Sequence, residues 1–142
     1  MEKRIIAGLD QSQAVIDHLK SLLSVCQVFT FNGTLGAGKT TLVRMLLQQC
    51  GVEDVVTSPT FTYVNLYKNK QGKTFYHFDL YRIQTLDDFV AAGFDEYLYE
   101  ENSISLIEWP ELIQPLLKNS VCNVVIKMHG FDKREFIITA QE

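Results

Sequence analysis

Gly33-Thr34-Leu35-Gly36-Ala37-Gly38-Lys39-Thr40 is the stretch that decides the fold, because it reads G-x-x-x-x-G-K-T. This spacing is typical of the phosphate-binding loop of nucleoside triphosphatases, which needs a strand before it and a helix after it. Residues 28–31 favour a strand and residues 41–49 favour a helix. The motif therefore stands in the right context, and a glycine-rich turn that binds nothing is the weaker interpretation.

The residue types of this loop predict how it binds phosphate. The glycines allow bare N–H groups to approach an anion, and the positive end of the following helix adds to them. Lys39 supplies a charge for the β- and γ-phosphates, and the Thr40 hydroxyl is suited to Mg²⁺. The predicted nucleotide contacts in the loop are Gly33, Leu35, Gly36, Ala37, Gly38, Lys39, Thr40 and Thr41.

The composition predicts a single soluble domain over residues 1–142, with 46% apolar and 21% charged residues. No apolar run approaches the ~20 residues of a membrane span, and the N-terminus lacks a signal-peptide core. Cys26, Cys50 and Cys122 match neither a zinc site nor a disulfide framework. We expect buried thiols, a cytoplasmic location and no membrane contact.

The formal net charge is −4, and the lysines and arginines are scattered along the chain. A protein that grips nucleic acid by itself usually presents a basic face. If nucleic acid is involved, we therefore expect a partner to hold it.

The remaining pattern predicts an α/β domain. Asp10 and Gln13 resemble a capping box that opens a helix to about Leu23. Residues 61–67 and 73–79 favour two strands of an antiparallel hairpin, and Thr85 is a candidate helix cap. Further predicted elements are a strand at 104–107, a helix from Pro110 to about Leu117, and strands at 121–128 and 134–139. The expected architecture is a three-layer, P-loop NTPase-like domain with a mixed sheet.

Two acidic residues are candidates to complete the site. Glu108 closes the strand at 104–107, and Asp79 closes the strand at 73–79. Ligands of α/β sheets collect at the carboxyl ends of parallel strands, so both acids fit if their strands run parallel to the loop strand. Either one could position Mg²⁺ or the attacking water, and the sequence leaves that choice open.

Other side chains have two interpretations each. The hydroxyls of Ser58 and Thr60 suit either a γ-phosphate contact or a turn, and Trp109 suits either the core or the nucleotide. Arg82 and Arg134 are candidates to neutralise charge in the transition state, although most arginines are solvated. His77 lies within a strand, so a structural role is the favoured interpretation.

The motifs also bear on the kind of phosphate-loop protein. No N-K-x-D segment is present, because Asn69-Lys70 is followed by Gln71-Gly72, and Asp79 is followed at the third position by Arg82 instead of glycine. GTP specificity is therefore disfavoured. A small-molecule kinase would need a lid and an acceptor pocket, for which the chain has little room. A nucleotide-gated binding module without hydrolysis remains the second alternative.

Four segments in order resemble the TsaE family, the P-loop ATPases of bacterial tRNA threonylcarbamoyladenosine biosynthesis. They are residues 33–41, Ser58–Thr62, His77–Arg82 and Leu106–Pro110, and the resemblance runs from about residue 5 to about residue 135. It implies a cytoplasmic enzyme that hydrolyses ATP with Mg²⁺. It also implies partnership with the TsaB–TsaD complex, which modifies the adenosine next to the anticodon, so that tRNA is met only through the partners.

The resemblance implies roles for individual residues. Thr40 and Glu108 would hold Mg²⁺, and Lys39 would hold the phosphates. Asp79 and Trp109 match residues that the family needs for nucleotide handling or activity, so Lys39, Asp79 and Glu108 form the predicted catalytic set. Gln11 and Arg134 match regions near the base. Thr34 departs from the family pattern, which commonly has Asp there, and a hydroxyl cannot act as a fixed negative charge.

Overall fold

One mixed sheet organises the chain in the computed structural model, which describes residues 1–59 and 61–141. Its seven strands follow the order β1-β7-β6-β2-β5-β4-β3 across the sheet. Their bounds are β1 Glu2–Ala7, β2 Val28–Asn32, β3 Val64–Lys68, β4 Thr74–Asp79, β5 Ser103–Glu108, β6 Val121–His129 and β7 Lys133–Gln141.

The four central strands run in the same direction. β2 pairs in parallel with both β5 and β6, and β5 pairs in parallel with β4. The outer pairs β3–β4, β6–β7 and β1–β7 are antiparallel. The phosphate loop and both candidate acids therefore lie at the same edge of the sheet, since each follows or ends a central strand.

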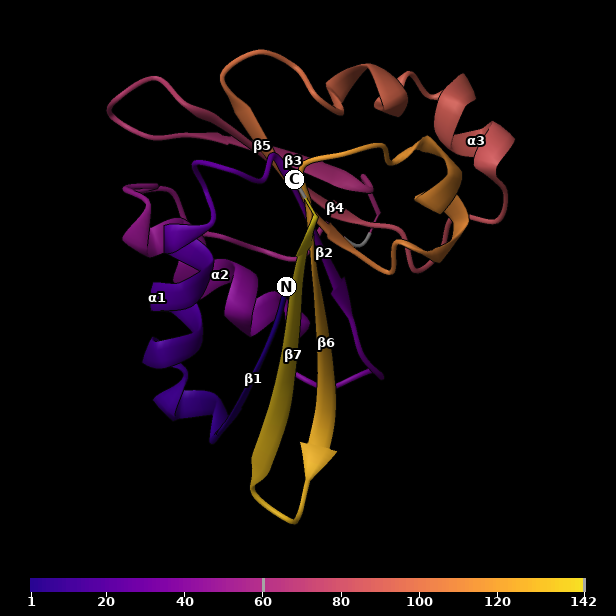
Figure 1. Ribbon diagram of the computed structural model, residues 1–142. Helices are drawn as coiled ribbons and strands as arrows, with labels where there is room; N and C mark the ends of the chain where they lie inside the picture. The colour runs from indigo at the N-terminus through magenta and orange to yellow at the C-terminus, as the bar shows by residue number, and fades with distance from the viewer. Residues whose placement is uncertain (60, 142) are drawn as a thin grey trace.

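Helices cover both faces of this sheet (Figure 1). The helices α1 (Gln13–Ser21) and α2 (Lys39–Gln49) pack on one face. The helix α3 (Leu86–Ala91) and the 3₁₀ segments η2 (Phe94–Tyr97) and η3 (Glu111–Leu116) pack on the other. The predicted three-layer α/β fold with an antiparallel hairpin is thus confirmed.

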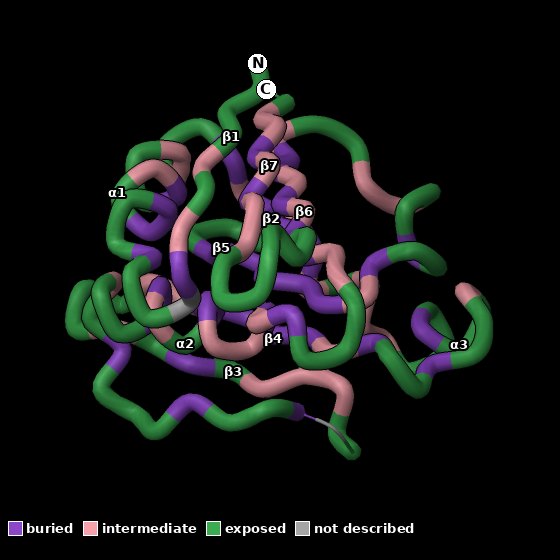
Figure 2. Tube along the Cα trace, turned by 90° about the horizontal axis from the view of Figure 1, so that it is seen from below, coloured by how far each residue is buried: buried purple, intermediate pink, exposed green. Residues whose placement is uncertain are grey.

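The burial pattern explains why the central strands read as continuous apolar runs. Every residue of β5 is buried, and so are residues 28–31 of β2. Strands covered on both faces lose the alternation of an exposed sheet. Figure 2 shows the buried residues gathered on the central strands and the exposed ones on the outer loops.

Three local predictions were wrong, each for a physical reason. Asp10 lies in a short 3₁₀ turn, η1 (Leu9–Gln11), so α1 begins at Gln13 instead of being capped by Asp10. The strand expected from residue 61 begins at Val64, because Tyr63 has a φ of +67° that interrupts extended backbone. The segment after Pro110 is a 3₁₀ helix that contains Pro115, which removes an N–H donor from an α-helix.

The edge strand β1 was missed. Four of its six residues are exposed, so the sequence carries little apolar alternation there. Its pairing with β7, from Glu2 opposite Thr139 to Ala7 opposite Arg134, holds it in place. None of the helices formed by residues 1–59 and 61–141 has the length and apolar character that a bilayer crossing demands.

Candidate functional site

The phosphate loop joins β2 to α2 and depends on three glycines. Gly36 and Gly38 have φ values of +79° and +106°, in the region that L side chains rarely adopt. Gly33 approaches β6 so closely that a Cβ atom would lie 3.0 Å from the carbonyl oxygen of Ile126. The glycines therefore fix the shape of the loop at the start of α2, where helix N–H groups favour anions.

Lys39 begins α2 and turns back over the loop. Its Nζ donates to the carbonyl oxygens of Gly33 at 2.5 Å and Thr34 at 3.0 Å, and it lies 3.9 Å from the centre of the Trp109 ring. The ammonium is therefore held against the loop by two carbonyls, at the cavity that Lys39 lines. Phosphate oxygens are stronger partners for it than neutral carbonyls.

Burial lowers the pKa of Lys39 below its ordinary value, and the nearby carboxylates of Glu108, Asp79 and Glu111 oppose that effect. The residue as a whole is only 5% exposed. A triphosphate would add negative charge beside the amine, which favours the charged form. A bound triphosphate would therefore oppose the effect of burial on the pKa of this amine.

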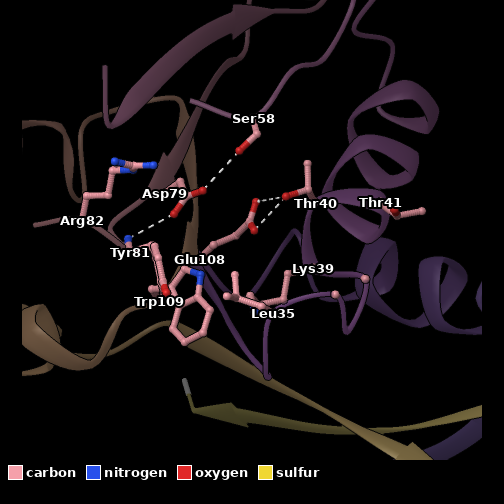
Figure 3. A pocket seen from close by; sticks show the side chains of 12 residues that line it. Leu35, Lys39, Thr40, Thr41, Ser58, Asp79, Tyr81, Arg82, Glu108 and Trp109 are labelled. Carbon is pink, nitrogen blue, oxygen red and sulfur yellow. Dashed lines mark hydrogen bonds between the residues drawn. The ribbon is translucent and has the colours of Figure 1, made fainter. Parts of the chain in front are cut away.

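Glu108 and Thr40 face each other across the site (Figure 3). The Thr40 hydroxyl lies 2.9 Å from both carboxylate oxygens of Glu108. Glu108 ends β5 opposite Phe31 of β2, so the sheet register brings it to the loop. A hydroxyl and a carboxylate at this spacing offer the hard oxygen ligands that Mg²⁺ prefers.

Residues 1–59 and 61–141 contain no cluster of three or more His, Cys, Asp or Glu side chains suited to a metal. Mg²⁺ commonly takes one or two carboxylates and completes its shell with phosphate oxygens and water. The Thr40–Glu108 pair beside a phosphate loop fits that requirement, so these residues fit Mg²⁺ bound together with a nucleotide.

Asp79 ends β4 directly opposite Glu108 in the sheet register. Its carboxylate accepts hydrogen bonds from the Ser58 hydroxyl at 3.2 Å and from the Tyr81 N–H at 3.1 Å. The parallel strands β4 and β5 thus bring both predicted acids to one place. Thr60, which the sequence also singled out, lies outside the described residues.

A cavity of about 450 Å³ contains most of the predicted site. Among its lining residues are Leu35, Gly36, Gly38, Lys39, Thr40, Thr41, Asp79, Glu108 and Trp109. Ser58, Tyr81 and Arg82 complete the lining (Figure 3).

Four predicted nucleotide contacts lie outside that lining. Gly33 and Ala37 form the back of the loop, and Arg134 of β7 donates from Nε to the Ala37 carbonyl at 3.1 Å. Arg134 therefore supports the loop from behind. Gln11 lies exposed in η1, away from the cavity lining.

Trp109 has an unusual backbone. Its φ is +57°, a conformation that is rare for a bulky side chain and that concentrates at functional sites. Its ring lies 4.8 Å from that of Tyr81, and both residues line the cavity. The strained turn after Glu108 thus places the indole beside Lys39 at the cavity, while the partly buried side chain also packs against the core on the α3 face of the sheet.

Sequence reasoning missed two residues at this site. His77, predicted to be structural, places Nε2 at 2.6 Å from the Glu108 carboxylate. Its position two residues before Asp79 was the available signal, because side chains two apart in a strand share a face. Tyr81 follows Asp79 by two residues but lies beyond the strand end, so strand periodicity could not place it.

The comparison with solved structures agrees with the fold. A crystal structure of Bacillus subtilis YdiB matches the whole chain with a TM-score of 0.74 and 31% identity, over 88% of that protein. Among curated proteins, the Bacillus subtilis tRNA threonylcarbamoyladenosine biosynthesis protein TsaE is 34% identical over 92% of this chain and 80% of its own length. The Haemophilus influenzae protein of the same name is 44% identical over 78% of this chain and 68% of its own length.

The family comparison covers nearly the same region. The family described as threonylcarbamoyl adenosine biosynthesis protein TsaE matches residues 6–136, which include the phosphate loop, Asp79, Glu108 and Arg134. With the relatives above, this match means that the chain belongs to the TsaE family.

Proposed function

We propose that this protein binds and hydrolyses ATP with Mg²⁺ in support of tRNA threonylcarbamoyladenosine biosynthesis. The observation that carries the proposal is the Thr40 hydroxyl, which lies 2.9 Å from both oxygens of Glu108 directly beside the phosphate loop. Membership of the TsaE family supports the pathway. The nucleotide and its hydrolysis are inferred from the chemistry of the site.

The phosphate loop would bind the triphosphate through its N–H groups, and Lys39 would leave the Gly33 and Thr34 carbonyls for the β- and γ-phosphates. Thr40 and Glu108 would hold Mg²⁺, which supplies charge neutralisation at the phosphate oxygens when bound. The contact between Thr40 and Glu108 is already made in the folded protein, so this pair needs little reorganisation, whereas Lys39 exchanges its carbonyl contacts for phosphate oxygens.

Asp79 would orient the attacking water. Its carboxylate is held by the Ser58 hydroxyl and the Tyr81 N–H, and it lies beside Glu108 in the register. A carboxylate can accept a hydrogen bond from water and direct a lone pair in line with the γ-phosphate. Glu108 is already engaged by Thr40, which favours Asp79 for this task.

Turnover by the isolated protein should be slow. Arg82 lines the cavity, but its guanidinium lies 5.3 Å from the centre of the Phe61 ring instead of beside Lys39. An arginine that reaches the γ-phosphate is worth about 10³–10⁵ in rate in other nucleotide hydrolases. We therefore propose that the TsaB–TsaD complex is the partner that completes or gates the site.

The charge of the chain supports an indirect contact with tRNA. With a net charge of −4, it lacks the excess of basic residues that phosphate backbones attract. We propose that the partners hold the tRNA at the adenosine next to the anticodon, in the cytoplasm. An affinity capture with this protein as bait tests the partnership. We expect it to recover TsaB and TsaD when ATP is present and not when nucleotide is absent.

Lys39→Ala tests the hydrolysis. We expect phosphate release from ATP and Mg²⁺ to fall by at least ~100-fold, because the charge that offsets the transferring phosphoryl group is lost. Lys70→Ala is the matched control, since Lys70 is exposed and pairs with Glu53 on the surface. It should hydrolyse ATP at the wild-type rate.

The same assay separates the alternatives. Transfer of γ-phosphate to a metabolite with little free phosphate would identify a kinase, and ATP binding with no ADP after hours would identify a binding module. Either result would contradict the proposed hydrolysis. Retained activity in Lys39→Ala would overturn the role of that lysine.

A further inference from the structure

His77 is a buried titratable residue that the proposed mechanism does not use. It lies in β4, is fully buried, and places Nε2 at 2.6 Å from Oε2 of Glu108. The side chain of Glu108 is itself only 3% exposed. The carboxylate is therefore held between two elements, by His77 of β4 on one side and by Thr40 of α2 on the other.

The partners of the imidazole indicate which nitrogen carries hydrogen. An ionised carboxylate only accepts, so the Nε2 atom beside Glu108 must be the donor. Nδ1 is buried and has no hydrogen-bond partner among the residues that the structure describes. A bare acceptor there costs less than a second buried N–H without an acceptor would. The arrangement favours the tautomer with hydrogen on Nε2.

We propose that His77 is a positioning residue for the magnesium site, an inference that rests on the proposed function. Its Nε2–H donates to Oε2 of Glu108 and so restrains rotation of the carboxylate. In the restrained orientation both carboxylate oxygens face the Thr40 hydroxyl. Without that donor the buried carboxylate loses one of its two polar partners and can rotate toward another. Residues that orient a metal ligand typically change metal affinity or activity by about 10–100-fold.

A plain core histidine is the competing explanation. It would contribute packing beside Phe75 and Leu106, and its replacement would lower stability without a selective effect on Mg²⁺. The two explanations differ in which atom of the side chain matters. Packing depends on volume, whereas positioning depends on a donor at the place of Nε2.

Two substitutions separate these explanations. The amide nitrogen of glutamine reaches about as far as the imidazole Nε2, whereas the shorter asparagine reaches only about as far as Nδ1. His77→Gln therefore keeps a donor for Glu108, and His77→Asn keeps a similar polarity without it. His77→Phe keeps the ring shape and removes the donor.

The measurement is the affinity for ATP, determined by calorimetry once with excess EDTA and once with Mg²⁺. The ratio of the two affinities is the gain from Mg²⁺. It is measured for the wild-type protein and for each variant that circular dichroism shows to be folded. We expect the EDTA affinities to agree within ~2-fold. The gain from Mg²⁺ should fall by about 10-fold or more in His77→Asn and His77→Phe, and should stay within ~3-fold of wild type in His77→Gln. Equal gains in His77→Asn and His77→Gln would overturn the proposal.

Imidazole ¹⁵N spectra of the unmodified protein provide a second test that needs neither a variant nor hydrolysis. The expected signature is hydrogen on Nε2 of His77, and hydrogen on Nδ1 alone would overturn the proposal. A wild-type affinity that does not respond to Mg²⁺ would instead overturn the proposed function. The spectra would then still decide whether His77 donates to Glu108.

Discussion

The contribution of Thr40 to this site depends on one atom, its hydroxyl oxygen. Its Oγ1 is the link between α2 and the buried carboxylate of Glu108, and the remainder of the side chain is apolar. Valine has nearly the same shape without the hydroxyl, and serine has the hydroxyl without the methyl group. The pair of substitutions therefore separates shape from coordination.

We expect Thr40→Val to reduce Mg²⁺-dependent ATP hydrolysis by about 100-fold, because it removes a metal ligand and leaves Glu108 with one polar partner fewer. Thr40→Ser should keep activity within ~10-fold of wild type. Steady-state phosphate release across a range of Mg²⁺ concentrations checks both. Equal losses in the two variants would show that the methyl group, and not the hydroxyl, is what matters.

At the residue scale, the sequence predicted which residues lie together at the cavity wherever a motif or a strand end fixed their position. Lys39 and Thr40 follow from the loop, and Glu108 and Asp79 follow because each ends a strand. The sequence favours a structural role for His77, because only the lateral alignment of β4 with β5 brings it to Glu108. That alignment is not local information. The two-residue spacing places His77 and Asp79 on one face of β4, but it does not show that Glu108 of β5 lies beside them.

At the scale of elements, α3 is a short helix whose beginning is defined by one side chain. Thr85 precedes it in extended conformation, and its Oγ1 accepts from the Asp88 N–H at 3.0 Å. A helix of six residues satisfies few of its own backbone groups, so the cap matters. The sequence predicted this cap from the residue type and its position.

Thr85→Ala should destabilise the protein by about 1 kcal/mol, because the Asp88 N–H loses its acceptor. Thr85→Ser keeps the oxygen and should stay within about 0.5 kcal/mol of wild type. Urea unfolding followed by circular dichroism measures both. A wild-type midpoint in Thr85→Ala would show that water replaces the cap without loss.

The two strands that the sequence missed or misplaced share a feature. β1 and the residues before Val64 lie at the outer strands of the sheet, where exposure weakens the apolar pattern. The central strands β2 and β5 were placed well because both of their faces are buried. Whether the apolar sequence pattern predicts a strand therefore depends on how much other elements bury it, and not on the local strand propensity.

At the scale of the whole molecule, the sheet has one apolar core on the α1–α2 face and another on the α3 face. These two cores determine which groups solvent can reach. Cys26, Cys50 and Cys122 are present as thiols, and Cys26 and Cys122 are buried. Burial, with a smaller effect from Cys26, raises the pKa of Cys122 to about 12. Burial also raises the pKa of the partly exposed Cys50 above its ordinary value.

A thiol reagent at pH 8 should therefore label the native protein slowly and at Cys50, because the thiolate is the reactive form and only Cys50 is accessible. Unfolding in urea should expose all three cysteines. Mass spectrometry of the labelled protein counts the adducts. Cys50→Ser is the control, and rapid labelling of that variant without urea would contradict the burial of the other two thiols.

The two cores share one sheet, so we predict that residues 1–142 unfold as a single cooperative domain. Phe89 tests this from the face of α3, where it is fully buried with ring centres 5.8 Å from Phe78 and 5.7 Å from Phe94. Phe89→Ala should cost about 3–5 kcal/mol, because it leaves a cavity in that core. Val90→Ala is the matched control, since Val90 is 43% exposed on the same helix.

Two probes then report on different parts of the structure. Fluorescence of Trp109, the single tryptophan, follows the nucleotide site, and far-UV circular dichroism follows all helices and strands. In a cooperative domain, Phe89→Ala shifts both urea midpoints equally, because the strands between the two cores cannot unfold on one face alone. A shift confined to circular dichroism would show that the α3 layer unfolds separately from the nucleotide site.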